Sequence, residues 1–360
     1  MSGGVDSSVA AAILKNQGYD CVGIFMHFWS EPGKTDRLNQ CCSAESFAAA
    51  RQVAHQLHFP IYTLNFETEF KKKIVDNFLA QYQNGTTPNP CVRCNKFIKF
   101  DLLWRKAKTF GCDYLATGHY IKKSEIRNPR FAGEAGRAKS GTSYTLSQAK
   151  DKAKDQSYFL YNLKSAQLPR LLFPLGNYLK TEVRQLAKEI NLPVYDKPDS
   201  QEICFVKNEK LNDFLKRHLK LKPGPIITVE GKTVGRHQGL PLYTLGQRKG
   251  IEIGGTGPFY VVKTDYKSNT LIISNKKDDA NLFVRKFTIK EVNWIYGRPK
   301  NWPKRYSVKI RYQTPSIKCQ MNNNTVTLSK SLRAVTPGQS AVFYQAKKLL
   351  GGGVIDKIRQ

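Results

Sequence analysis

A glycine-rich segment stands almost at the start of the chain, and a helical pattern follows it at once. Residues 2–8 read SGGVDSS, and small and apolar residues then recur at helical spacing up to Gly18. Glycines let backbone N–H groups approach an anion, hydroxyls add donors, and a helix N-terminus contributes positive potential. The segment therefore predicts a phosphate-binding loop, the alternative being an ordinary polar helix start. The residues of this loop are Ser2, Gly3, Gly4, Val5, Asp6 and Ser7.

The loop lacks a lysine after its glycines, so it is not the GxxxxGK[ST] loop in which a lysine reaches the β- and γ-phosphates. Phosphate has to be held differently here. Asp6 either helps to hold Mg²⁺ or lies in the first helical turn, where a negative charge is favourable.

Only Met1 precedes the loop, although such a loop normally follows a strand. In a doubly wound sheet the strand that feeds the first phosphate loop is usually central, so its absence predicts unpaired edges on the neighbouring strands. We hypothesise that the native chain carries an upstream strand or starts elsewhere. An intact mass of the native protein that matched residues 1–360 would refute this hypothesis.

Strand and helix patterns alternate over the first third of the chain. Apolar runs predict strands, and 3.6-residue periodicity predicts helices, including a face formed by Phe70, Ile74, Phe78 and Tyr82. Such alternation is typical of an α/β fold with a parallel sheet. The expected strands are 21–28, 61–65 and 114–117, and the expected helices are 7–17, 44–57 and 99–109.

The rest of the chain changes character twice. Residues 122–142 are basic and aperiodic, which predicts a loop or hairpin, and a helix capped by Thr181 is expected to end near Pro193. Beyond residue 222, short strand patterns separated by turns predict a β barrel or sandwich. We therefore expect three domains. They are an α/β domain over 1–158, a mainly helical central domain over 159–221 and a β-barrel domain over 222–360.

The chain is strongly basic, with 58 Lys and Arg against 28 Asp and Glu, a formal charge of +30. This balance favours a polyanionic partner such as nucleic acid over a merely lysine-rich solvated surface. No apolar run of about 18 residues and no secretory start appears, so we expect no membrane segment and a reducing cytoplasm. The eight cysteines then read as thiols, metal ligands or redox catalysts.

Two segments contain cysteines for which several chemical roles are possible. Residues 87–95 read TPNPCVRCN, and Cys204 lies in DSQEICF. A zinc site at the CxxC motif would need further ligands, which Cys41 and Cys42 could supply. Cys204, taken alone, would ordinarily be a small buried hydrophobic residue. A thiolate can also carry sulfane sulfur as a persulfide, which a second thiol can attack. These alternatives stay open on the residues alone.

Several motifs together resemble the bacterial tRNA-specific 2-thiouridylases, which belong to the pyrophosphate-loop ATP pyrophosphatases. The resemblance is collinear over nearly the whole chain. The motifs are SGGVDSS, GIFM at 23–26, TPNPCVRCN, ATGHY at 116–120, KDQSYFLY at 154–161, DSQEICF, GQRKG at 246–250 and TPGQSAVFY at 336–344. The resemblance implies that ATP activates the C2 oxygen of the wobble uridine of tRNA, which then becomes 2-thiouridine with release of AMP and pyrophosphate.

The resemblance also implies roles for particular residues. Cys94 would be the nucleophile, and Cys204 would carry the persulfide and form a transient disulfide with Cys94. The residues implied for ATP are Ser2 to Ser7, Met26 and Gly118. Those implied for the target base are Asn89, Pro90 and Cys91. Those implied for the rest of the tRNA are Lys154, Asp155, Gln156, Arg311 and Tyr312.

The implied partners are tRNAs for lysine, glutamate and glutamine, Mg²⁺ with the ATP, and a cysteine desulfurase with its sulfur-relay proteins. Some relatives carry Asp in place of Cys91, so this thiol would assist deprotonation only if its pKa were lowered. Strand alternation offers another reading, in which Tyr312 is a core residue and Arg311 is solvated. Met26 reads as a core residue, and His119 reads as a satisfied histidine as often as a ligand.

Two other functions compete with this one. One is an ATP pyrophosphatase that adenylates a small metabolite, which has no need for Cys94 and Cys204. The other is a noncatalytic RNA-binding module with a structural CxxC, which zinc binding and RNA binding without ATP hydrolysis would favour.

Overall fold

A computed structural model of the chain describes residues 1–31, 43–127, 142–199, 203–206, 210–251, 253, 258–299 and 306–359. The α/β reading of the first third is confirmed. It contains α1 (Val5–Asn16), β1 (Gly23–His27), α2 (Ala44–Gln56), β2 (Ile61–Asn65) and β3 (Leu115–Ala116).

The strands of this part run parallel but form two separate pairs. β1 pairs with β2, and β3 pairs with β6 (Leu171–Leu172), so the central region contributes a strand beside the first domain. α1 packs against α7 (Lys180–Glu189) through Val5, Val9, Val183 and Ala187, which are buried in one cluster. The central helix α7 is thereby fixed next to the start of the phosphate loop.

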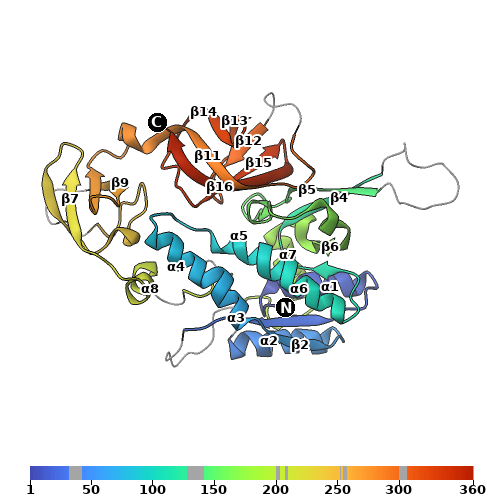
Figure 1. Cartoon of the computed structure of the whole chain (residues 1–360). Helices are drawn as coiled ribbons and strands as arrows, with labels where there is room; N and C mark the ends of the chain where they lie inside the picture. Colours follow the sequence, from blue (N-terminus) through green and yellow to red (C-terminus); the bar gives the residue numbers. More distant parts are fainter. Residues whose placement is uncertain are drawn as a thin grey trace.

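Two long helical stretches cross the middle of the molecule (Figure 1). One runs through α3 (Glu67–Phe70), the π-helical turn η1 (Lys71–Val75) and α4 (Asp76–Gln83). The other runs through α5 (Pro90–Cys94), η2 (Asn95–Leu102) and α6 (Leu103–Thr109). Their facing sides form the main core cluster, in which all four residues of the face predicted around Phe70 are buried. Helical periodicity therefore identified this contact correctly.

The central region is largely helical, as expected, but its main helix begins differently. α7 starts at Lys180, and the backbone N–H of Leu179 donates to the Glu182 side chain at 2.7 Å. Thr181 is therefore not the N-cap, because a capping glutamate one position later already satisfies the helix start. The remaining elements here are η4 (Ser157–Phe159), η5 (Ser165–Arg170), η6 (Pro174–Asn177) and α8 (Leu211–His218).

Residues beyond 222 form two sheets with separate cores. The first contains β7 (Gly224–Thr228), β8 (Thr233–His237), β9 (Tyr260–Asp265) and β10 (Thr270–Ser274) around Ile226, Val261 and Leu271. The expected β region thus consists of two units, because each sheet closes over its own apolar face.

The second sheet is a barrel. Six strands are joined in the order β11–β14–β13–β12–β15–β16, and β11 pairs with β16 to close the ring. The hairpin of β4 (Ile121–Arg127) and β5 (Thr142–Gln148) extends this sheet, which confirms a hairpin at 122–142, although its tip lies outside the described residues. The barrel strands are β11 (Phe283–Trp294), β12 (Tyr306–Lys309), β13 (Ile317–Asn322), β14 (Thr325–Arg333), β15 (Ser340–Gln345) and β16 (Lys348–Arg359). Within the described residues, no helix is long and apolar enough to cross a membrane.

Candidate functional site

The predicted phosphate loop is shaped by a glycine that no other residue could replace. Gly3 has a φ of +68°, and a Cβ there would lie 2.1 Å from the backbone oxygen of Ser46. The hydroxyls of Ser2 and Ser7 lie 3.0 Å apart, and the backbone N–H of Ser2 donates to Ser7 Oγ at 3.1 Å. The chain therefore curls tightly into the first turn of α1, where the leading N–H groups of a helix have no intrahelical partner.

Gly118 lies directly against this turn. It follows β3, and a Cβ on it would lie 2.9 Å from both the backbone carbon of Asp6 and the nitrogen of Ser7. Met26, the other distant residue implied for ATP, lies near the carboxyl end of β1 and is half-buried against the main core. The structure thus brings Gly118 to the loop, and the role of Met26 at the nucleotide stays a prediction.

His119 is a buried, satisfied histidine. Its Nδ1 lies 2.9 Å from the hydroxyl of Thr117, and burial, with a smaller effect of Lys99, holds its pKa well below the ordinary value. The imidazole is therefore neutral at physiological pH and serves the packing next to Gly118.

A buried lysine reaches the phosphate loop from the central region. Lys180 is only 8% exposed, and its Nζ donates to Asp6 at 2.7 Å and lies 2.8 Å from Asp199. The hydroxyl of Tyr120 also donates to Asp6, at 2.7 Å, and burial together with this carboxylate raises the pKa of Tyr120. Sequence reasoning missed Lys180 and Tyr120, because only tertiary packing makes them neighbours of the loop: Lys180 through α7, and Tyr120 through the segment between β3 and β4.

Asp199 joins this network to a predicted tRNA-binding residue. Its carboxylate accepts from Lys154 at 2.6 Å, and Arg184 lies 2.9 Å away. Burial opposes ionisation of Asp199, but the hydrogen bonds from Lys154 and Lys180 outweigh it and lower its pKa to about 2. Asp199 opens the DSQEICF motif, so the network connects the phosphate loop with the segment of Cys204.

The CxxC motif forms a short helix with a clear local cause. Asn89 caps α5, since its side-chain oxygen accepts from the Val92 N–H at 3.3 Å, and Pro90 occupies the first helical position. Cys91 is exposed at the start of this helix, whereas Cys94 is only 8% exposed.

Cys94 and Cys204 border the same apolar cluster. Cys94 is a member of the main core, and the half-buried Cys204 packs against that core from a segment far along the chain. Asn95, next to Cys94, donates to the backbone oxygen of Phe159 at 3.2 Å, which ties this helix to the KDQSYFLY motif. Both thiols thus contact one extended core, while Cys41 and Cys42 are outside the described residues.

Hydrogen bonds from the barrel hold the segment that leads into α5, the helix that carries Cys91 and Cys94. The Gln339 side chain donates to the backbone oxygens of Thr87 at 3.0 Å and Pro88 at 3.2 Å, and the Thr87 N–H donates to the Pro337 oxygen at 2.9 Å. The TPGQ turn therefore holds the TPNPC loop, two motifs that the sequence alone does not connect.

The five residues predicted to contact tRNA beyond the base lie in two segments, 154–156 and 311–312. The two segments adjoin, since the Gln313 side chain donates to the Ala153 backbone oxygen at 3.4 Å. Asp155 is 4% exposed and accepts from the N–H of Ala149 and the hydroxyl of Ser157. Gln156 accepts from the Tyr120 N–H at 2.9 Å. Both side chains therefore organise the protein interior.

Arg311 and Tyr312 lie just beyond a strand rather than on it. β12 ends at Lys309, so the expected alternation to residue 312 is wrong at its end. Arg311 donates to the Ala334 oxygen at 2.6 Å, and Tyr312 packs on Phe159 with ring centroids 4.6 Å apart.

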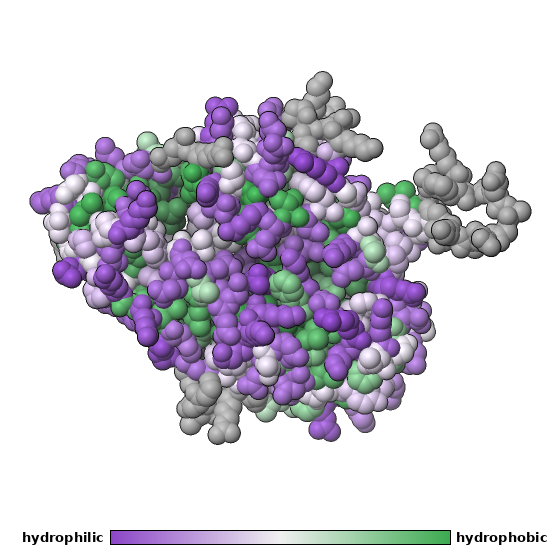
Figure 2. Space-filling model, viewed as in Figure 1, coloured by the Kyte–Doolittle hydropathy of each residue, from purple (hydrophilic) through white to green (hydrophobic). Residues whose placement is uncertain are grey.

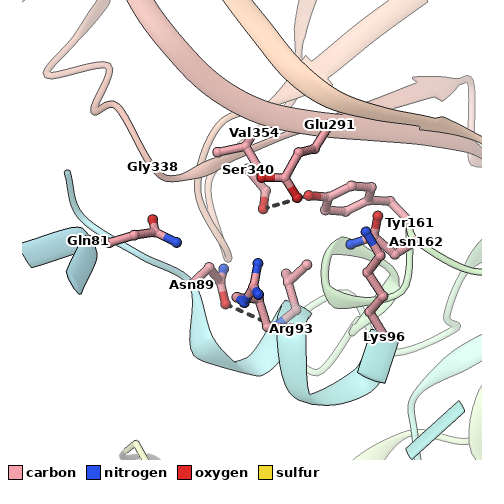
Figure 3. A pocket seen from close by; sticks show the side chains of 11 residues that line it. Gln81, Asn89, Arg93, Lys96, Tyr161, Asn162, Glu291, Gly338, Ser340 and Val354 are labelled. Carbon is pink, nitrogen blue, oxygen red and sulfur yellow. Dashed lines mark hydrogen bonds between the residues drawn. The ribbon is translucent and has the colours of Figure 1, made fainter. Parts of the chain in front are cut away.

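A cleft opens between α5 and the barrel (Figure 3). Asn89, Arg93 and Lys96 line one wall of this cleft, and Glu291 and Ser340 line the other. Within the described part of the chain, no group of His, Cys, Asp and Glu is arranged to hold a metal ion.

Three family models match the chain in sequence order. They describe a tRNA methyl transferase HUP domain over residues 1–208, a tRNA methyl transferase PRC-barrel domain over 212–275 and an aminomethyltransferase beta-barrel domain over 284–355. The chain is similar to the tRNA-specific 2-thiouridylase MnmA of Clostridioides difficile, with 40% identity over 364 residues that cover 99% of this chain and 97% of the relative. The protein of the same name from Sodalis glossinidius is 43% identical over 367 residues, covering 99% and 95%.

Proposed function

The chain belongs to the family of tRNA-specific 2-thiouridylases, and we propose on that premise that it converts a uridine of tRNA into 2-thiouridine at the expense of ATP. The observation that carries the proposal is the presence of three parts together in residues 1–206. A phosphate loop opens α1, a cysteine helix carries Cys91 and Cys94, and Cys204 packs against the same core as Cys94.

The first step is adenylation of the target base. The N–H groups at the start of α1 and the hydroxyls of Ser2 and Ser7 would hold the phosphates of ATP. The loop itself has no lysine, and Lys180 supplies a cation there through its hydrogen bond to Asp6. The C2 oxygen of the uridine attacks the α-phosphorus, and pyrophosphate leaves.

The second step is sulfur transfer. The terminal sulfur of a persulfide on Cys204 attacks C2, and AMP leaves with the former C2 oxygen. The Cys94 thiolate then attacks Cys204 Sγ, which releases 2-thiouridine and forms a Cys94–Cys204 disulfide. A thiol reductant supplies the two electrons that restore both thiols, and a cysteine desulfurase with relay proteins supplies the next sulfur.

The tRNA would meet the protein through residues of differing roles. Asn89, Pro90 and Cys91 form the start of α5, where Cys91 is exposed and Pro90 is buried, and a flipped base would arrive at this end of the helix. Lys154 and Tyr312 would contact the strand from the adjoining segments, whereas the buried Asp155, together with Gln156 and Arg311, would position those segments. The expected acceptors are the tRNAs for lysine, glutamate and glutamine.

Mg²⁺ would accompany ATP and offset the charge of its phosphates. Asp6 is the carboxylate at the loop and fits this task, because its side chain is held beside the first helical turn by Tyr120 and Lys180. The cytoplasm is the compartment in which we propose that the chain acts. The division into domains at 158 and 221 belongs to the same proposal.

The fate of the C2 oxygen tests this chemistry. The protein is incubated with ATP, Mg²⁺, a persulfide donor and tRNA carrying ¹⁸O at C2 of the wobble uridine. Mass spectrometry should find ¹⁸O in AMP in equal amount to the 2-thiouridine formed. Label in inorganic phosphate, or 2-thiouridine formed without ATP, would contradict adenylation at C2.

A further inference from the structure

Three cations surround one aromatic ring on the outer side of the cysteine helix. The ammonium of Lys96 lies 5.0 Å from the centre of the Phe97 ring, the guanidinium of Arg93 lies 4.9 Å from it, and the ammonium of Lys73 lies 5.6 Å from it. We call Lys73, Arg93 and Lys96 the Phe97 cluster. Arg93 also donates from Nε to the Lys73 backbone oxygen at 3.3 Å, which leaves the two terminal nitrogens of its guanidinium for another acceptor.

The Phe97 cluster is only partly neutralised within the described residues, because the charge of Glu291 acts on Arg93 alone among its three cations. None of the ion pairs found there includes any of its three cations, although neighbouring Lys71 pairs with Asp76. Glu291 is the one acidic side chain among the residues that line the adjoining cleft. Like charges repel when they are held together, so an arrangement of this kind favours an anionic partner.

The helix presents the cluster and the cysteines on opposite sides. Residues 89, 92, 93 and 96 line the cleft, which is the spacing of one helical face. Residues 94, 95 and 98 are buried on the other face. Since a helix with its side chains is about 10–12 Å across, the cleft lies within that reach of Cys94.

The cleft offers hydrogen-bonding groups suited to a nucleotide. Gln81, Asn89 and Asn162 turn amide groups toward it, and each amide can both donate and accept (Figure 3). Figure 2 shows hydrophilic residues covering this middle part of the molecule, over α4 and α5. In protein surfaces that bind RNA, Arg and Lys usually contact the phosphates, and amide side chains contact the bases or sugars.

We propose that the Phe97 cluster and the adjoining cleft bind the backbone of the substrate RNA next to the nucleotide that enters at Cys94. This inference rests on the proposed function and deepens it, because it assigns RNA contacts to Lys73, Arg93 and Lys96, which lie outside the motifs at 154–156 and 311–312. The cluster anchors the strand behind the helix while the target base turns to the cysteine side.

Binding of an anticodon stem–loop RNA by the full chain tests the inference. The variant Lys73→Gln/Arg93→Gln/Lys96→Gln should bind about tenfold or more weakly in moderate salt, and the slope of log K against log salt should fall by about 2, near 0.7 for each lost phosphate contact. Lys108→Gln is the matched control, because Lys108 also lies over a ring, at 5.6 Å from Trp104, outside the cluster. Its binding should stay within about twofold.

The RNA can be neutralised instead of the protein. An RNA with a single uncharged methylphosphonate beside the target uridine should bind the unaltered protein more weakly than the unmodified RNA does. The triple variant should bind the two RNAs equally well. An unchanged affinity and salt slope in the triple variant, with its melting temperature retained, would overturn the inference. Lost affinity for an acidic sulfur-donor protein with RNA binding intact would overturn it too and assign the surface to that protein.

The outcome is separable from that of the proposed function. If the unaltered protein binds RNA with the expected dependence on the cluster yet forms no 2-thiouridine, the function fails and the RNA-binding surface stands. If it forms 2-thiouridine and the triple variant binds RNA equally well, the surface fails and the function stands.

Discussion

The ammonium of Lys180 lies 2.7 Å from the carboxylate of Asp6, although the two residues belong to different regions of the chain. Asp6 stands in the first turn of α1, and Lys180 opens α7 and is also bound to Asp199. A loop without a lysine of its own thus obtains one through tertiary packing. The charge is held in place before ATP arrives, which is the condition under which electrostatic stabilisation is most effective.

Removing this cation should impair the reaction with ATP. We expect Lys180→Met to lower kcat/KM for ATP by about 100-fold, the range found when one preorganised donor is lost. Lys150→Met is the matched control, because Lys150 makes a 2.7 Å ion pair with Glu182 on the same helix but is exposed. Steady-state AMP release measures both. Equal kinetics in the two variants would remove Lys180 from the ATP site.

Gly118 should tolerate no side chain. In Gly118→Ala the new methyl group would lie 2.9 Å from backbone atoms of Asp6 and Ser7 and would push the first turn of α1 out of place. We expect ATP affinity, measured by calorimetry, to fall about tenfold or more, since this turn carries the donors for phosphate. Gly235→Ala, whose methyl group would meet its nearest atoms at 3.8 Å, should bind ATP normally. Normal binding by Gly118→Ala would disprove the contact.

The lowered pKa of Asp199 predicts that the protein loses folding stability in acid. Its pKa is lowered to about 2, so its ionised form stabilises the folded state above the unfolded value near 3.9, and this contribution disappears as the pH falls toward 2. The unfolding free energies of the native protein and Asp199→Asn should therefore differ at pH 7 and converge between pH 4 and pH 2.

Urea titrations across this pH range provide the measurement. Asp113→Asn is the control, because Asp113 is exposed and lies 3.6 Å from Arg170, so its removal should change little at any pH. A difference for Asp199→Asn that stayed constant down to pH 2 would contradict the account.

The barrel should position the cysteine helix through Gln339. Gln339→Leu removes two hydrogen bonds to the backbone of Thr87 and Pro88. We expect kcat for thiolation to fall about tenfold while KM for ATP is unchanged, because misplaced reacting groups slow chemistry without affecting a separate nucleotide site. Gln185→Leu, which loses a bond to Glu189 on an exposed helix face, should leave both parameters unaltered. A raised KM for ATP would instead indicate general unfolding.

Local patterns in the sequence predicted the elements but not their contacts. The face of Phe70, Ile74, Phe78 and Tyr82 follows from spacing and is confirmed. The phosphate loop stays a prediction, in which Gly3 takes the positive φ that glycine allows. The roles of Lys180 and Gln339 depend on packing between distant segments, which no local pattern encodes. Asp155, implied to contact tRNA, is 4% exposed, and no local pattern predicts the burial of an acidic residue, since such residues are rarely buried unless they are paired.

The β region illustrates the same limit. The two longest barrel strands, β11 and β16, lack a clear strand pattern, since one is interrupted by charges and the other contains the glycine run 351–353. Glycine lowers strand propensity, and alternating patterns do not say which strands pair. Hence one barrel was expected beyond residue 222 where two sheets with separate cores occur.

The requirement for both thiols tests the central claim most directly. The protein and its variants Cys94→Ser, Cys204→Ser and Cys112→Ser are given ATP, Mg²⁺, unmodified lysine tRNA and a persulfide donor, and 2-thiouridine is quantified by mass spectrometry after digestion. Cys112 is half-buried after α6, outside the proposed site, and serves as the control. We predict full product with Cys112→Ser and loss of product by about 100-fold or more with either of the others. Product from Cys94→Ser or Cys204→Ser at the native rate would contradict the two-thiol mechanism.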